Sequence, residues 1–225
     1  MDAWIKDNKP SWGSGWTEGD IMYEDLDGNH IVNQGANTLA DSGDRRIIGN
    51  STPRYHFGVN MGLSWKGFDF SMFWQGVAKR DLWLSGNMFW GLNGGEWQST
   101  GLKEQLDYYR PANTTSVFGP NTDAYFPRVY MNSDKNQYVQ TRYLRNGAYA
   151  RLKNIQLGYS LPKQLVDKAH LQKVYLYVSA ENLFTIKSLP KTFDPETAYS
   201  NYTDSNTGKT YPLQKTVSFG LDVSF

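Results

Sequence analysis

The sequence contains no cysteine and only three histidines among its 225 residues. Without cysteine there is no disulfide framework and no thiol nucleophile, and the redox state of the compartment stays open. His30, His56 and His170 are scattered and lack the spacing of zinc ligands. No glycine-rich phosphate loop or G-x-S-x-G turn occurs, and Asp194 and Glu196 belong to a polar loop. We therefore predict that the chain is not an enzyme.

Strong charge and long apolar runs are also missing. Lysine and arginine number 23 against 22 acidic residues, so nothing favours a nucleic-acid partner. No apolar run approaches the roughly 20 residues that a membrane helix needs. The mean hydropathy of −0.61 is also compatible with transmembrane strands, because these alternate apolar and polar residues. The first residues lack a basic region followed by an apolar core, so we expect no signal peptide in this chain.

Aromatic residues are abundant, at 15% of the chain, and the sequence ends on one of them. The last segment alternates with a strict period of two, which indicates a strand with one apolar face. Its pattern resembles the C-terminal signal by which the outer-membrane assembly machinery recognises bacterial barrel proteins. The residues that carry this pattern are Ser218, Gly220, Leu221, Val223 and Phe225. An amphipathic edge strand of a soluble protein would alternate in the same way.

A hairpin is predicted over residues 54–78. Apolar residues occupy every second position from Tyr55 to Trp65, which is long for a soluble strand and suits a tilted membrane strand. Lys66-Gly67 then forms a two-residue turn. In the second strand Phe73 is an aromatic residue on the otherwise polar face.

The same alternation predicts two strands within residues 142–184 and a terminal strand at 213–225. Residues 162–171 form a short connector with room for one or two helical turns. Residues 1–53, 79–141 and 185–212 are long polar loops, the second with a short helix around 102–109. Long and short connections therefore alternate, as extracellular loops and periplasmic turns do in outer-membrane barrels. We predict an all-β fold of antiparallel up-and-down strands with long loops: about five strands that form the C-terminal portion of a transmembrane β-barrel, an incomplete barrel.

Several short sequence segments across the chain form one further pattern. They are Gly19-Asp20-Ile21, Asp25-Leu26-Asp27-Gly28, the run from Asp44 to Pro53, the run from Trp65 to Ser71 with Phe73-Trp74-Gln75-Gly76, Tyr125-Phe126-Pro127-Arg128, the run from Ala148 to Pro162, and the run from Ser179 to Thr185. In their order and spacing these segments resemble the C-terminal part of SusC/RagA-type TonB-dependent transporters.

This resemblance implies a large outer-membrane barrel of Bacteroidetes-type bacteria that imports oligosaccharides or peptides. It further implies energy from TonB, contacted through N-terminal regions that this chain lacks, and a SusD-like surface lipoprotein as a lid. Five strands cannot close a barrel, so we expect an outer-membrane protein of which this chain is a fragment, inactive by itself. Two alternatives stay open: a soluble, aromatic-rich β-sandwich that binds carbohydrate, and a truncated remnant without function.

A cation site is the first candidate for chemistry. Alternating carboxylate and amide oxygens in a curled loop suit a hard cation such as Ca²⁺, although His30 stands where a sharp turn favours glycine. A loop closed by its own Asx turns would have the same composition. The candidate ligands from this spacing are Asp25, Asp27, Asn29 and Asn33. The family resemblance implies a further ligand just before an arginine, which is Asp44 here within residues 25–44, with Asp41 as an alternative.

Two sets of side chains are candidates for contact with a cargo or a partner. Phe73, Tyr175, Tyr177 and Glu181 should point into the lumen, where they line the passage or pack against a plug domain. Aromatic residues of the loops could stack on a sugar or peptide, although such residues more often pack loops together or meet a partner protein. These are Trp83, Trp90, Trp97, Tyr108, Tyr109, Tyr199 and Tyr202.

Overall fold

The computed structural model describes residues 2–8, 10–91, 101–131, 133–198, 208–211 and 213–225. The chain divides into two compact units. The sheet unit comprises Ser51–Leu82, Arg145–Tyr199 and Tyr211–Phe225. The loop unit comprises Met1–Asn50, Trp83–Leu144 and Ser200–Thr210.

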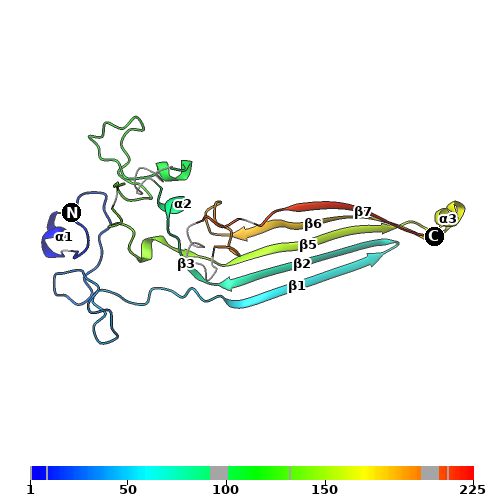
Figure 1. Cartoon of the computed structure of the whole chain (residues 1–225), viewed down its shortest axis with the longest axis horizontal. Coiled ribbons are helices and arrows are strands. Elements are labelled where there is room, and N and C mark those ends of the chain that lie inside the picture. The colour runs from blue at the N-terminus through cyan, green and yellow to red at the C-terminus, as the bar shows by residue number, and fades with distance from the viewer. Residues whose placement is uncertain (1, 9, 92–100, 132, 199–207, 212) are drawn as a thin grey trace. The chain divides into compact units, whose positions relative to one another are not determined.

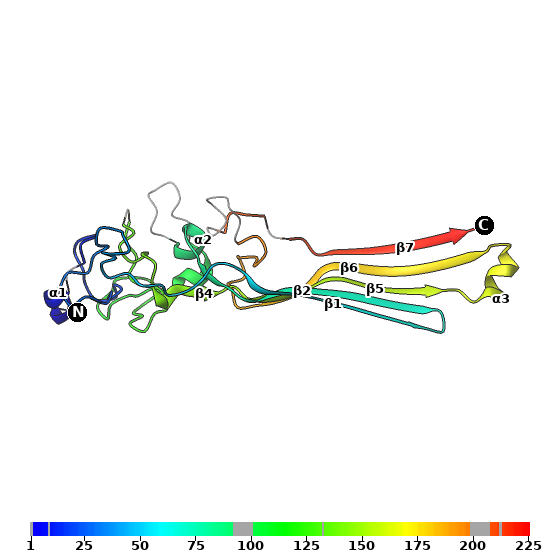
Figure 2. The same ribbon diagram turned by 90° about the horizontal axis from the view of Figure 1, so that it is seen from below.

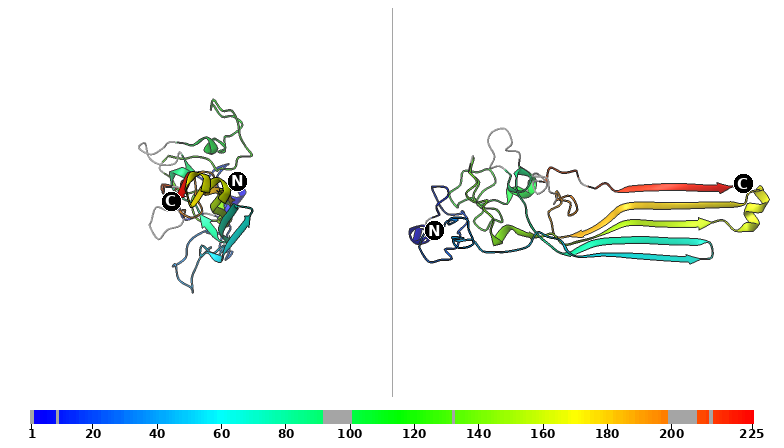
Figure 3. Two further views of the ribbon diagram at one scale, coloured as in Figure 1. Left: turned by 90° about the vertical axis from the view of Figure 1, so that its right-hand side faces the viewer. Right: turned by 60° about the horizontal axis from the view of Figure 1, so that its bottom comes forward.

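Five antiparallel strands form the sheet unit, and each pairs with its neighbour in the order β1-β2-β5-β6-β7 (Figure 1, Figure 3). Their bounds are β1 Arg54–Trp65, β2 Phe68–Lys79, β5 Tyr149–Ser160, β6 Lys173–Lys187 and β7 Thr216–Ser224. β1 and β7 are the two edges, so the sheet is open. The prediction of about five up-and-down antiparallel strands in an incomplete barrel is confirmed.

The turn between β1 and β2 is as short as the sequence indicates. Lys66 and Gly67 both have positive φ, at 47° and 86°. This is the combination of a type I′ turn, whose twist matches that of the flanking strands. Trp65 consequently pairs with Phe68, and the register continues to Arg54 opposite Lys79.

An irregularity interrupts the ladders on both sides of β5. The β2–β5 register shifts between Phe73 and Trp74, and the β5–β6 register shifts between Leu152 and Asn154. Gln75 pairs with Arg151 while Phe73 pairs with Asn154. An extra residue in β5, as in a β-bulge, therefore brings Arg151 and Asn154 to the same face, which unbroken alternation would not do.

The connector between β5 and β6 contains the helical turns that its length allows. These are α3, Lys163–Val166, and a 3₁₀ turn, Asp167–Ala169, which lie beyond the last residue of β5 and the first residue of β6 (Figure 2). Val166 is buried, and His170 adopts a left-handed conformation that ends the turn.

The remaining elements are short. β3 (Asp81–Trp83) and β4 (Leu144–Asn146) pair as a two-stranded sheet, and α1 (Asp2–Asp7), α2 (Asn87–Trp90) and 3₁₀ turns at Lys103–Leu106 and Thr141–Tyr143 complete the fold. The helix expected around 102–109 is only the first of these 3₁₀ turns, because Tyr108 and Arg110 instead form extended bridges to Phe126 and Asn121. Within the described residues, no helix combines the length and apolar character required to cross a membrane.

The loop unit has an aromatic core that its polar composition did not indicate. Phe89, Trp90, Phe126 and Tyr143 are buried, and their rings meet mostly edge to face, with centroids 4.9 Å apart for Trp90 and Tyr143. Such pairs contribute about 0.5–1.5 kcal/mol beyond the area that they bury. The described part of the long connection after β2 is therefore packed around aromatic side chains.

Candidate functional site

The two faces of the sheet differ in chemistry. The apolar face carries Tyr55, Phe57, Val59, Met61, Leu63 and Trp65 of β1, and Val217, Phe219 and Leu221 of β7. All of these side chains are exposed, Leu63 by 67% and Phe219 by 84%. The polar face carries the alternate residues of the strands, among them Asn60 of β1 and Asn154 and Gln156 of β5. A sheet in water would cover such an apolar face, whereas a sheet in lipid exposes it.

Two tyrosines lie on the polar face beside glycines. Tyr175 and Tyr177 are stacked, with ring centroids 5.8 Å apart. A Cβ atom on Gly158 would lie 1.9 Å from the Tyr175 hydroxyl, and one on Gly220 would lie 2.1 Å from the Tyr177 ring. The glycines thus provide the space in which both rings lie against the backbone of the sheet.

The other two residues predicted to face the lumen are on the same face. Phe73 pairs with Asn60 and Asn154, and its ring lies beside Gly58. Glu181 pairs with Asn154 and Thr216, and it is exposed. Their exposure to a lumen stays a prediction.

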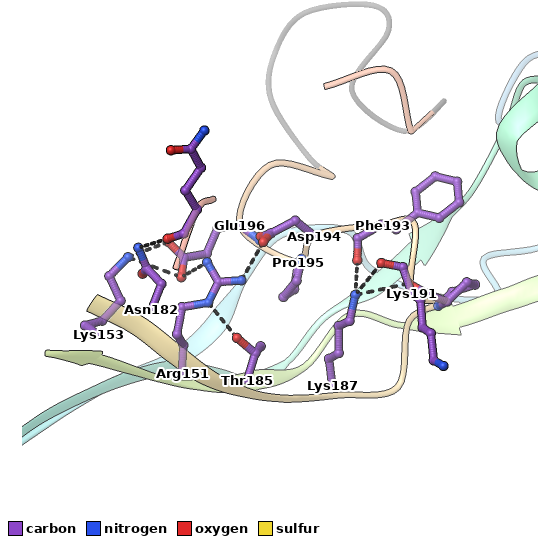
Figure 4. A network of polar contacts seen from close by, with 12 residues as sticks. Arg151, Lys153, Asn182, Thr185, Lys187, Lys191, Phe193, Asp194, Pro195 and Glu196 are labelled. Carbon is purple, nitrogen blue, oxygen red and sulfur yellow. Dashed lines mark hydrogen bonds and ion pairs between the residues drawn. The ribbon is translucent and has the colours of Figure 1, made fainter. Parts of the chain in front are cut away.

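At the end of the sheet where β6 finishes, the polar face carries a cluster of charged residues (Figure 4). Arg151, 3% exposed, contacts Asp194 Oδ2 at 2.6 Å and Glu196 Oε1 at 2.8 Å. Its Nε donates to Thr185 Oγ1 at 2.8 Å. Lys153 lies 3.1 Å from Glu196 Oε2. Asp194 and Glu196, which the sequence placed in a polar loop, are therefore part of a nearly buried ion-pair network.

Sequence reasoning missed this network because the residues that pair in it, such as Arg151 and Asp194, are 43 residues apart. The one available signal was the presence of Arg151 and Lys153 in a strand expected to cross a membrane. Charges in such a strand need partners or water. The sequence could not indicate which acidic residues those partners are.

Three of the five predicted cation ligands come together in the loop unit. Carboxylate oxygens of Asp25, Asp27 and Asp44 all lie within 4.8 Å of one another. Asn29 and Asn33 instead accept the backbone N–H groups of Ile31 and Gly35. The alternative ligand, Asp41, belongs to a neighbouring turn, where it accepts from Ala36 and Gly43.

Backbone N–H groups compensate the negative charge of this acidic loop. Asp25 accepts from Gly28 and His30, and Asp44 accepts from Leu26 and Asn33. Desolvation opposes ionisation of Asp25, but the hydrogen bonds from His30 and Gly28 outweigh it and lower its pKa. His30 has a φ of 63°, so a non-glycine residue does take the left-handed conformation here. Cation binding stays a prediction, because the Asx-turn alternative accounts for the same contacts.

A second ion pair, fully buried, holds the loop unit together. Lys135 Nζ lies 2.9 Å from Asp20 Oδ2, with side-chain exposures of 3% and 0%. Asn136 donates to the other Asp20 oxygen at 2.9 Å, and the Tyr130 hydroxyl donates to Oδ2 at 3.1 Å. Burial raises the pKa of Tyr23, whose hydroxyl donates to the Lys135 carbonyl. Asp20 of the Gly19-Asp20 motif therefore connects the N-terminal segment to Tyr130, Lys135 and Asn136.

The aromatic residues proposed as ligand contacts are mostly engaged in packing. Trp90 is buried, which excludes it from direct ligand contact in this conformation, and Trp83 packs against it. Tyr108 lies beneath Arg110, and the Tyr109 hydroxyl donates to Glu18. Trp97, Tyr199 and Tyr202 lie outside the described residues.

The C-terminal motif lies in and after the edge strand. Leu221 and Val223 pair with Leu176 and Val174, while Ser218 and Gly220 pair with Ser179 and Tyr177. Phe225 follows the strand and is 84% exposed. Apolar and polar positions therefore fall on opposite faces, and recognition by an assembly machinery stays a prediction.

Comparison with known proteins agrees with this geometry, although no family model matches the chain. TonB-dependent receptor P3 of Formosa agariphila is 34% identical over 214 residues, which cover 92% of this chain and 19% of that receptor. TonB-dependent receptor P26 of the same organism is 25% identical, with 92% and 20% covered. The chain thus spans about a fifth of the length of these curated relatives.

Solved structures of the RagAB peptide transporter are also similar. One matches with a TM-score of 0.59 and 27% identity, over 80% of this chain and 18% of the other. A RagAB peptide importer in a closed-closed state matches with a TM-score of 0.57 and 26% identity, over 89% of this chain and 20% of the other.

The open antiparallel meander, with one exposed apolar face and one polar face, defines a segment of a transmembrane β-barrel. More particularly, the chain is homologous to TonB-dependent receptors, and its sheet corresponds to the C-terminal part of the barrel of a RagA/SusC-type transporter. The relatives are described as receptors and transporters.

Proposed function

We propose that this chain forms the C-terminal wall of an outer-membrane importer that takes up oligosaccharides or peptides with energy from TonB. The observation that carries the proposal is the apolar face. Every residue of β1 is exposed, and its apolar side chains line one face from Tyr55 to Trp65. Exposed apolar surface of this extent is stable in lipid and is an aggregation hazard in water.

Under this proposal the rest of the receptor completes the barrel. β1 and β7 have unpaired edges, and open edges are not viable within a bilayer. Further strands of a longer receptor would pair with them and close the barrel. TonB would act on regions beyond this chain, a SusD-like lipoprotein would cover the loop side, and the outer-membrane assembly machinery would recognise the segment from Ser218 to Phe225.

Of the two cargo classes, peptides have the more direct support, because the solved relatives are described as peptide transporters. The names of the curated relatives state no cargo. A deletion strain that loses uptake of labelled oligopeptides but keeps uptake of labelled oligosaccharides would support peptides. The reverse pattern would assign the importer to oligosaccharides.

Charge substitutions on the two faces test the membrane proposal. In the full-length receptor, Val59→Arg places a charge on the apolar face and should cost about 2–4 kcal/mol near the bilayer midplane. Asn60→Lys, one residue away on the polar face, should assemble normally. The measurement is the amount of folded receptor in the outer membrane. Loss of folding for Asn60→Lys would contradict a watery lumen beside the polar face.

Fractionation of native cells distinguishes a full-length importer from the remaining alternative, a truncated remnant without function. An antibody against residues 185–212 should detect a band far larger than 25.7 kDa in the outer membrane. A band near that mass in the soluble fraction, or no band, would leave the truncated remnant or the soluble module as the better explanation.

A further inference from the structure

Residues 188–198, which follow β6, are pinned to the polar face of the sheet; we name them the strap. The first anchor is Lys187, the last residue of β6, whose ammonium group donates to the carbonyls of Pro190, Lys191 and Phe193 of the strap. Three carbonyls around one ammonium group fix the direction of the chain as it leaves the strand. Figure 4 shows these contacts beside the Arg151 cluster.

The second anchor is Arg151, which lies in the middle of the sheet unit's strand order, in β5. Its guanidinium contacts both carboxylates of the strap, Asp194 and Glu196, and also Thr185 of β6. Moving the strap away would leave a nearly buried guanidinium without its counter-charges. A buried charge that loses its partners is strongly disfavoured, so the contact opposes opening.

The third anchor combines hydrogen bonds to backbone carbonyls with the burial of apolar side chains. Arg80 donates to the carbonyls of Pro195 and Ser51, which ties the strap to the segment before β1. Leu189, Phe193 and Ala198 of the strap are buried, and the exposed fraction of Phe193 and of Ala198 is only 1%. A lid drawn from the low-stability part of a protein has few buried contacts. The strap has ionic, backbone and apolar contacts together.

We propose that the strap is a fixed part of the wall of the import passage. Arg151 holds it against the sheet, and it does not open as a lid during import. The polar face to which it is pinned is the face opposite the lipid-exposed one, so this inference rests on the function proposed above. Arg151 is a positioning residue, because it contacts the strap and no reacting group.

Cysteine accessibility tests whether the strap is fixed. This chain has no cysteine, so single cysteines can be placed in a full-length receptor from which any others are removed. Ala198→Cys is a small change at a buried position, and Thr192→Cys is its exposed control in the same strap. With a membrane-impermeant maleimide on intact cells, Thr192→Cys should label quickly and Ala198→Cys at least about tenfold more slowly. This difference should persist in energised cells and in cells treated with an uncoupler. Labelling of Ala198→Cys that rises in energised cells would overturn the fixed strap.

A second variant tests the role of Arg151. Arg151→Met in the Ala198→Cys background removes the cation and should raise labelling towards the rate of Thr192→Cys. Arg151→Lys keeps the charge but loses the planar fork that contacts two carboxylates, so it should restore protection only in part. Unchanged protection of Ala198→Cys with Arg151→Met, in a receptor that still assembles, would show that Arg151 does not hold the strap.

The position of the strap in the passage has its own readout. A bulky polyethylene-glycol maleimide attached to Thr192→Cys should reduce cargo uptake several-fold, whereas the same reagent should not affect the cysteine-free receptor. Uptake unchanged by the attached polymer would contradict the wall assignment. If the unmodified receptor imports no cargo, the proposed function fails, while the labelling pattern still decides whether the strap is fixed.

Discussion

The sheet unit and the loop unit reach stability by opposite means. The sheet unit repeats one pairing rule over strands of 9 to 15 residues, exposes its apolar face, and gathers its buried charges under the strap. The loop unit has little regular structure, and it depends on an aromatic core and on the Asp20–Lys135 pair. A periodic segment thus distributes its stability over many equivalent strand pairs, whereas an aperiodic one concentrates it in a few particular side chains.

The largest effect should follow from breaking the buried pair of the loop unit. Lys135→Met leaves the Asp20 carboxylate buried without its cation, which should cost about 3–5 kcal/mol in the loop unit. Amide hydrogen exchange of the full-length receptor should show faster exchange in residues 11–24 and 128–138, with the strands unchanged. Arg46→Met is the control, because the Arg46–Glu24 pair is 60% and 70% exposed and exposed pairs contribute little. Equal effects of the two variants would contradict the role given to Lys135.

A smaller effect should come from filling a glycine position in the sheet. Gly220→Ala places a Cβ atom 2.1 Å from the Tyr177 ring, so the ring must move, at a cost of about 1–3 kcal/mol. The midpoint of urea unfolding of the assembled receptor measures this cost. Gly62→Ala is the matched control, because its nearest neighbour is the Phe70 carbonyl oxygen at 3.9 Å.

A double variant then identifies the cause. Once Tyr177→Ala removes the ring, adding Gly220→Ala should cost much less than it does in the parent receptor, because contacting residues are non-additive. Additive costs would mean that Gly220 matters for a reason other than the space for Tyr177.

The smallest effect concerns the acidic loop, where the sequence predicts Ca²⁺. If the prediction is correct, addition of Ca²⁺ should slow amide exchange within residues 25–44, and a chelator should reverse this. Asp44→Asn should abolish the response, whereas Asp41→Asn, in the neighbouring turn, should keep it. No response to Ca²⁺ in the parent protein would mean that hydrogen bonds such as those to Asp25 and Asp44 compensate the negative charge without a cation.

Much of the sheet could be predicted from the sequence because its signals are local. Alternation from Tyr55 to Trp65 predicted all of β1 except its first residue, Arg54, and Lys66-Gly67 indicated the turn. The face assignments of Tyr175 and Tyr177 follow from the same period, and the register places both on the polar face. The irregularity in β5 has no such local signal, since it appears only when three strands are paired.

The loop unit was less predictable for a physical reason. Its core residues, such as Phe89 and Phe126, are far apart in sequence and follow no period, so nothing local indicates that they meet. The acidic loop is an intermediate case. Asp25 and Asp27 are two residues apart, and the sequence analysis gives Asp44 as a further ligand with Asp41 as the alternative. The tertiary structure brings Asp44 to Asp25 and Asp27 and leaves Asp41 in a neighbouring turn.

The sequence by itself determined the strands of the five-stranded sheet, their two faces, the short turns and the family resemblance, because each depends on neighbouring residues and, for the strands, on a fixed period of two. It did not indicate the short strands β3 and β4. Only the tertiary structure decided which charges meet. Arg151 and Lys153 of β5 find Asp194 and Glu196 across 43 residues, and Lys135 finds Asp20 across more than a hundred. Ion pairs of this kind depend on where the backbone brings two side chains in space, and sequence separation carries no information about that distance.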